Sequence, residues 1–234
     1  MVRTGTWAVV LVIGWGGLAM AADSPWEKEI KAFEAADKEA MPPGGGTLFT
    51  GSSTIRLWTT LARDLPDHAV INRGFGGSEI ADATAFADRI IIPYRPATVV
   101  IRAGGNDIHN GKPPEKVFAD FRAFVAKVRG ALPEAKIAYI SIAPTIARKA
   151  EVARTDALNG MIRDYLAKTP NTTYIDATDM TLAADGTIRP ELFVADGLHF
   201  SPAGYKLLTE RVRTALGSPA RAKAKAEPEP AGVR

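Results

Sequence analysis

Two short runs of the sequence, 98–101 and 137–140, carry apolar side chains on both faces of a strand. A strand with one face in water alternates apolar and polar residues, whereas a run that is apolar on both faces is typical of a buried parallel strand. Around these runs, short strand-like segments alternate with longer segments of helical periodicity. We therefore predict an α/β fold, arranged as a three-layer α/β/α sandwich.

Five strands are expected in this alternation, and each precedes a helix. The predicted strands are 47–50, 70–72, 97–103, 136–143 and 173–177, and the predicted helices are 53–64, 78–90, 114–132, 150–168 and 201–216. Before them, four apolar residues at helical spacing predict an amphipathic helix over 24–40. Two prolines and three glycines then break the pattern at 41–46, which we interpret as a linker.

The chain is 46% hydrophobic and 24% charged, which is an ordinary composition for a globular protein. Its 234 residues are enough for one domain with its own hydrophobic core. Residues 1–22 hold one charge, an apolar run and then small residues, so we expect a signal peptide and export to a periplasm or the medium. The apolar run is shorter than the roughly 20 residues of a membrane span. We assign 23–46 to the helix and linker, 47–216 to the α/β domain, and 217–234 to a disordered tail.

Several chemistries are excluded or disfavoured by composition and spacing. The chain has no cysteine, which excludes disulfides and thiolate chemistry. No His-Glu-x-x-His motif suggests a metal, and the glycines at 74, 76 and 77 do not fit a dinucleotide fingerprint. The formal charge of +3 is small and comes largely from the tail, so nothing indicates a nucleic-acid partner. We expect no cofactor and no metal.

Ligands of such sheets bind in the crevice beyond the carboxyl ends of the strands. Polar and glycine-rich stretches are expected at this edge. They are residues 51–53 after the first strand, 73–78 after the second, 104–107 after the third, and 196–199 before the last helix.

The first of these stretches can present a serine hydroxyl. A strand that turns directly into a helix leaves the first N–H groups of that helix unpaired, in a partly positive potential that favours an oxyanion. Ser52 or Ser53 can occupy this place, although serine is also an ordinary N-cap residue. Ile55 stands where a Gly-x-Ser-x-Gly elbow has its last glycine, so the ordinary α/β-hydrolase fold is disfavoured.

A serine nucleophile needs a base that is oriented by a carboxylate. Of the three histidines, 68, 109 and 199, His199 is the best candidate because Asp196 lies three residues before it and Ser201-Pro202 fixes the following turn. Asp176 and Asp179 follow the fifth strand but have no histidine near them in sequence, so they rank lower.

An oxyanion also needs N–H donors. Gly77 can offer a backbone N–H with no side chain in the way, and Asn106 can offer its amide. Asp107 is a candidate cap of the local turn. Each of these residues also has a purely structural interpretation, since glycine, asparagine and aspartate are common in turns.

Taken together, the four stretches resemble the four blocks of the SGNH (GDSL-type) hydrolase family. Residues 49–53, 72–78, 104–107 and 196–199 stand in the order of the family's Ser, Gly, Asn and His blocks. The resemblance covers about residues 25–216. One residue departs from the family pattern, because Ser52 stands where the usual Gly-Asp-Ser motif has its aspartate.

The resemblance implies a flavodoxin-like, five-stranded parallel sheet, no cofactor, and hydrolysis of carboxylic esters. It implies that Ser53 is the nucleophile and that Asp196 and His199 complete a triad. The oxyanion donors would be the N–H groups of Ser53 and Gly77 and the amide of Asn106.

We therefore expect an exported serine hydrolase that cleaves short acyl esters, such as O-acetyl groups on carbohydrate, because no long hydrophobic lid segment stands out. A lysophospholipase or thioesterase is the alternative within the enzyme class. A glycan-binding module that has lost turnover is the alternative outside it. The expected partner is a small-molecule or glycan ester. We expect no stable insertion of the protein into a membrane after the signal peptide is cleaved. The sequence leaves the oligomeric state open.

Overall fold

The computed structural model describes residues 24–217. The predicted signal peptide and all but the first residue of the predicted tail lie outside these residues. Within 24–217, no helix is long and apolar enough to span a bilayer.

Five parallel strands form one sheet in the order β2-β1-β3-β4-β5. Their bounds are β1 (Thr47–Gly51), β2 (Val70–Gly74), β3 (Thr98–Arg102), β4 (Lys136–Ile140) and β5 (Thr172–Ile175). β1 lies between β2 and β3, with Phe49 opposite both Asn72 and Val100. This order places the change of winding direction between β1 and β3, where ligands of doubly wound sheets bind. The predicted α/β class and the flavodoxin-like parallel sheet are confirmed.

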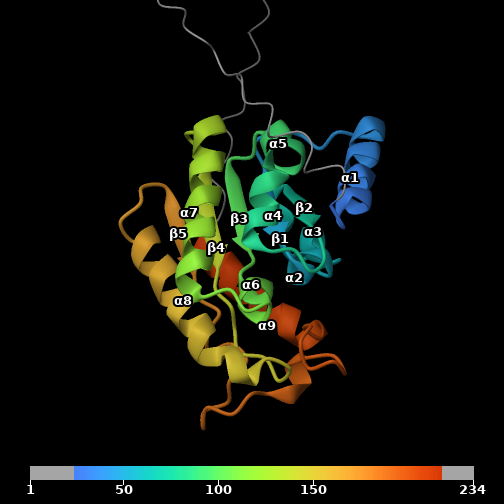
Figure 1. The fold of residues 1–234 in the computed structure, drawn as a ribbon. Coiled ribbons are helices and arrows are strands. Elements are labelled where there is room, and N and C mark those ends of the chain that lie inside the picture. The colour runs from blue at the N-terminus through green and yellow to red at the C-terminus, as the bar shows by residue number, and fades with distance from the viewer. Residues whose placement is uncertain (1–23, 218–234) are drawn as a thin grey trace, which may run out of the picture.

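Helices cover both faces of the sheet, as Figure 1 shows for α4, α7 and α8 in front of it and α9 behind it. One face packs against α1 (Glu27–Glu39), α4 (Ile80–Ala85), α5 (Ala87–Ile90), α7 (Pro114–Ala131) and α8 (Val152–Leu166). The other face packs against α2 (Ser53–Arg56), α3 (Leu61–Asp64) and α9 (Pro202–Leu216). Shorter elements are α6 (Gly105–His109) and four 3₁₀ turns, η1 (Pro66–His68), η2 (Ile92–Tyr94), η3 (Lys149–Glu151) and η4 (Pro190–Leu192).

Successive strand residues enter two different hydrophobic cores. Val99 and Ile101 pack into the core under α4, α7 and α8, whereas Val100 between them packs into the core under α2 and α9. All three side chains are fully buried. Because neither face of the strand meets water, the sequence is apolar at consecutive positions rather than at alternate ones.

Two predicted helices are broken in the structure, which corrects the sequence analysis. The helix predicted over 53–64 is α2 and α3, separated by a turn in which Trp58 is fully buried and donates from Nε1 to Asp64 Oδ2 at 2.7 Å. The helix predicted over 78–90 is α4 and α5, separated at Phe86. Neither break falls at a proline or glycine, so helical periodicity did not reveal it.

Candidate active site

Ser53 is the first residue of α2 and follows strand β1, which lies between β2 and β3, almost directly. Gly51 ends that strand with φ +120°, and a Cβ there would lie 2.1 Å from the carbonyl oxygen of Arg102. Only glycine fits this conformation and this close approach. The Ser52 N–H donates to the Arg102 carbonyl at 3.1 Å, which holds the turn against β3. The nucleophile candidate thus stands at the carboxyl edge of the sheet on a tightly packed turn.

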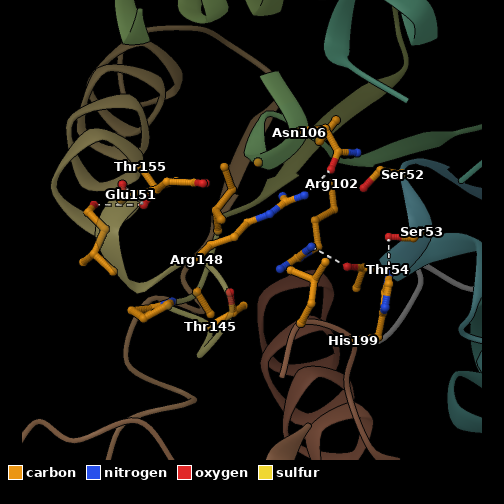
Figure 2. A pocket seen from close by; sticks show the side chains of 17 residues that line it. Ser52, Ser53, Thr54, Arg102, Asn106, Thr145, Arg148, Glu151, Thr155 and His199 are labelled. Atoms are coloured by element: carbon orange, nitrogen blue, oxygen red, sulfur yellow. Dashed lines mark hydrogen bonds between the residues drawn. The ribbon is translucent and has the colours of Figure 1, made fainter. Parts of the chain in front are cut away.

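His199 and Asp196 lie in the loop between η4 and α9. One oxygen of Asp196, Oδ1, accepts from the backbone N–H groups of Leu198 and His199 at 2.8 and 2.9 Å. The other, Oδ2, lies 2.6 Å from Nδ1 of His199. His199 Nε2 lies 2.9 Å from Ser53 Oγ, and Figure 2 shows this contact at the edge of the pocket. Asp196, His199 and Ser53 therefore form one continuous hydrogen-bonded chain.

The charge state of Asp196 follows from these contacts. The hydrogen bonds from the His199 ring and from the two backbone N–H groups lower the pKa of Asp196 to about 2. An ionised carboxylate accepts a proton-bearing Nδ1, so the neutral ring of His199 has its lone pair on Nε2. That lone pair faces the Ser53 hydroxyl, and this is the arrangement that a general base requires.

The other candidates from the sequence lie elsewhere. His109 ends α6, although the sequence before Gly111 predicts a loop there, and its Nδ1 lies 2.6 Å from Glu151 Oε1. His68 is buried in η1. Asp176 accepts from Thr178, and Asp179 pairs with Arg211 at 2.8 Å. Ser53, not Ser52, is the serine that His199 contacts.

The three predicted oxyanion donors follow β1, β2 and β3, which are neighbours in the sheet. Gly77 is exposed with φ +77°, and a Cβ there would meet nothing within 4 Å. The N–H groups of Ser53 and Gly77 donate to no other group among residues 24–217. Trp26, the residue before α1, fixes the peptide group between Gly76 and Gly77 by donating from Nε1 to the Gly76 carbonyl at 2.7 Å.

The amide of Asn106 is fixed from both sides. Its Oδ1 accepts from Arg148 Nη2 at 2.9 Å, and its Nδ2 donates to the Ser78 carbonyl at 2.9 Å. Arg148 has no acceptor to offer, so this pairing settles which end of the amide is the NH₂ group. One hydrogen on Nδ2 remains for a ligand, and the geometry gives Asn106 the donor that an oxyanion needs.

Asp107 has a larger role than the turn cap considered from the sequence. Its carboxylate is fully buried, accepts from the Ile80 N–H at 3.3 Å, and lies 3.3 Å from Lys112 Nζ. Burial raises its pKa to about 6. Since Ile80 begins α4 and Asp107 belongs to α6, this contact ties the loop that carries Gly77 to the helix that carries Asn106.

A small cavity of about 40 Å³ opens beside Ser53 and His199. Its wall includes three charged residues that the sequence analysis did not select, Arg102, Arg148 and Glu151. Arg102 could have been noticed as the one charged residue that ends an otherwise apolar strand. Arg148 and Glu151 lie in and after the loop that follows β4, and no pattern in the sequence marks them. Within the part of the chain that the structure describes, no cluster of His, Asp and Glu is arranged to hold a metal ion.

The family model for the GDSL-like lipase/acylhydrolase family matches residues 44–207. The chain belongs to this family. The resemblance seen in the sequence is therefore confirmed, and this GDSL-like protein is a carboxylic ester hydrolase. A comparison with curated protein sequences gives no match.

Several solved structures share the fold of this GDSL-like hydrolase. A protein from Streptococcus pneumoniae, provisionally described as a platelet activating factor, has a TM-score of 0.71 at 19% identity and covers 80% of this chain and 91% of its own. A GDSL-like lipase from Bacteroides thetaiotaomicron gives 0.68 at 18% identity, with 79% and 95% covered. An acetylxylan esterase from Geobacillus stearothermophilus gives 0.61 at 18% identity, with 76% and 97% covered. At these identities the likeness shows the fold alone.

Proposed function

We propose that this GDSL-like hydrolase cleaves short acyl esters through an acyl-enzyme on Ser53, with His199 as general base and acid and Asp196 as the orienting carboxylate. The observation that carries the proposal is the unbroken chain of contacts from Asp196 Oδ2 to His199 Nδ1 and from His199 Nε2 to Ser53 Oγ, at 2.6 and 2.9 Å. This is the geometry of a serine hydrolase triad.

The reaction runs in two halves. In the first, His199 Nε2 takes the hydroxyl proton while Ser53 Oγ attacks the ester carbonyl, and the same proton then passes to the departing alcohol oxygen. In the second, His199 takes a proton from water, which attacks the acyl-enzyme, and Ser53 leaves with that proton. The products are an alcohol and a carboxylic acid. The N–H groups of Ser53 and Gly77 and the Asn106 amide stabilise the oxyanion in both halves.

The cavity supports a small acyl group. At about 40 Å³ it has room for only a few heavy atoms next to Ser53, so we propose acetyl or a similarly short acyl group. An acetylated carbohydrate is the proposed substrate, in line with the acetylxylan esterase that shares the fold. A higher kcat/KM on an octanoyl than on an acetyl ester would instead support the lysophospholipase or thioesterase alternative.

The deciding experiment is labelling of the mature protein with a fluorophosphonate, followed by intact-mass measurement and peptide mapping. A single adduct on Ser53 is expected in the natural protein and in Ser52→Ala, and none in Ser53→Ala. Ser52→Ala is the matched control because it removes the neighbouring hydroxyl. An adduct on Ser52 would contradict the assignment. Folded protein that takes no label but binds a glycan would support the non-catalytic alternative.

We also propose that the enzyme is exported. The support is the sequence of residues 1–22, with one charge, an apolar run and small residues near Ala21 and Ala22. Sequencing the N-terminus of the protein recovered from cells tests this. A start near residue 22 or 23 is expected, and retention of Met1 in all of the protein would contradict the proposal.

A further inference from the structure

Arg102 is a buried cation with no carboxylate partner among the described residues. Its side chain is 8% exposed and lies in the wall of the cavity beside Ser53. Its Nη1 donates to Thr54 Oγ1 at 2.5 Å, its guanidinium stacks on the Phe200 ring, and its Nε has no hydrogen-bond partner within residues 24–217. Buried arginines are almost always paired with an anion, because removing a charge from water is costly.

Arg148 brings a second guanidinium to the same cavity. Figure 2 shows both side chains reaching into its middle, Arg102 from the end of β3 and Arg148 from the loop after β4. Arg148 Nη2 is bonded to the Asn106 amide oxygen, and Arg148 forms no ion pair with any of the residues described. Burial lowers the pKa of both arginines, the charge of Arg148 adds to the effect on Arg102, and the charge of Glu151 opposes the effect on Arg148. Two cations without an ion-pair partner among the described residues therefore line one small cavity.

Glu151 is the acidic residue of the cavity wall, and it forms no ion pair with either arginine. Its Oε1 is bonded to His109 Nδ1 at 2.6 Å, and its buried Oε2 has no hydrogen-bond partner in the described structure. Neither oxygen lies within ion-pair distance of Arg102 or Arg148. The cavity wall thus carries two positive charges against one negative charge.

We propose that Arg102 and Arg148 form an anion subsite, and that the preferred substrate is an ester whose acyl or alcohol part carries a carboxylate. The inference rests on the proposed function, because it places the carboxylate beside the acylation site. A carboxylate is favoured over larger anions because the cavity measures about 40 Å³. A guanidinium presents paired N–H donors that match the two oxygens of a carboxylate, and both Arg102 and Arg148 bring such a group to the cavity wall.

The first test uses the natural protein with matched ester pairs. On the alcohol side, 4-acetoxybenzoate is compared with its methyl ester. On the acyl side, the 4-nitrophenyl half-ester of succinic acid is compared with the same compound methylated at its free carboxylate, each rate being corrected for uncatalysed hydrolysis. We expect kcat/KM to be about tenfold or more higher for the carboxylate member of at least one pair, in line with a charge-assisted hydrogen bond. The pair that shows the preference identifies the part of the substrate that carries the anion.

The second test asks whether the two arginines cause the preference. Arg102→Gln and Arg148→Gln should each lower the ratio of the two kcat/KM values by up to about tenfold, toward one, as expected for the loss of a hydrogen bond to a charged group. Using a ratio cancels any general loss of turnover, which matters because Arg148 also holds Asn106. Arg102→Lys keeps the charge and should retain part of the preference. Arg122→Gln removes a cation from the exposed side of α7 and should leave the ratio unchanged.

Failure of the inference and failure of the proposed function give different results. A protein that is labelled on Ser53 and hydrolyses the methylated esters, but prefers neither carboxylate, would overturn the anion subsite alone. A carboxylate preference that survives both Arg102→Gln and Arg148→Gln would also overturn it. Folded protein that takes no label and hydrolyses no ester would overturn both.

Discussion

His199 Nε2 lies 2.9 Å from Ser53 Oγ, although 146 residues separate the two in the chain. Ser53 begins α2, and His199 stands just before α9, which shares a hydrophobic core with α2 on one face of the sheet. Tyr205 on α9 donates its hydroxyl to the Thr54 carbonyl at 2.9 Å, one residue from the nucleophile. Packing of these two helices therefore sets the distance between His199 Nε2 and Ser53 Oγ.

Replacing Asp196 by asparagine tests the orienting carboxylate. Because its pKa is about 2, Asp196 is ionised throughout the neutral range. The ionised carboxylate favours the tautomer of His199 that carries its proton on Nδ1. An asparagine side chain in its place could present its NH₂ group to Nδ1 and favour the wrong tautomer, so Asp196→Asn should lower kcat by about 10⁴-fold. Steady-state kinetics on an acetyl ester measures the effect. The matched control is Asp185→Asn, in an exposed turn, which should keep full activity.

Asn106→Ala removes one proposed oxyanion donor and should leave the fold intact. The expected loss in kcat is about 10²- to 10³-fold, with a smaller change in KM, because the donor acts on charge that develops in the transition state. Asn110→Ala removes a nearby amide that bonds to Glu79 at 2.8 Å and should change kcat little. Thermal unfolding of both variants verifies that they fold. Undiminished turnover in folded Asn106→Ala would contradict the oxyanion role.

Burial of Asp107 predicts a pH-dependent stability. Its pKa rises from 3.8 to about 6 on folding, so the folded state favours the protonated acid. Its contribution to stability is therefore fully present below about pH 4 and is lost as the pH rises through 6. At about 1.4 kcal/mol for each pH unit between the two pKa values, the loss is up to about 3 kcal/mol.

Asp107→Asn removes this titration. Urea unfolding of both proteins at several pH values measures the difference in their free energies of unfolding, in which the titration of all other groups largely cancels. The natural protein should lose stability relative to the variant between pH 4 and 7. A difference that stays constant across this range would show that Asp107 does not titrate there.

The sheet and the clustering of Ser53, Asp196 and His199 at its edge could be predicted from the sequence because their signals are local. Runs that are apolar on both faces mark the strands, and polar residues directly after strands gather at one edge of a parallel sheet. The break at Trp58 could not be predicted, since it depends on a tertiary contact, the packing of the indole against Phe49 and Tyr205. The pairing of Arg102 with Arg148 was missed for the same kind of reason, because the end of β3 and the loop after β4 come together only in the folded protein.

Two glycines of the site should respond to alanine in opposite ways. At Gly51 a Cβ would lie 2.1 Å from the Arg102 carbonyl oxygen, and at Gly77 it would meet nothing within 4 Å. Both residues have positive φ, which costs an alanine about 1–2 kcal/mol. Gly51→Ala adds a backbone clash to this cost, so β1 and β3 would have to separate, and we expect a much lower unfolding temperature or no folded protein.

Gly77→Ala should fold with only that modest loss of stability, yet lose activity. In the proposed mechanism the ester carbonyl approaches the Gly77 N–H, and a methyl group on this residue would obstruct that approach. We expect kcat/KM to fall by about 10- to 100-fold, within the range for a weakened oxyanion donor. Measuring unfolding temperature and kcat/KM on the same samples separates the two effects. Full activity in Gly77→Ala would mean that the oxyanion is bound without this N–H.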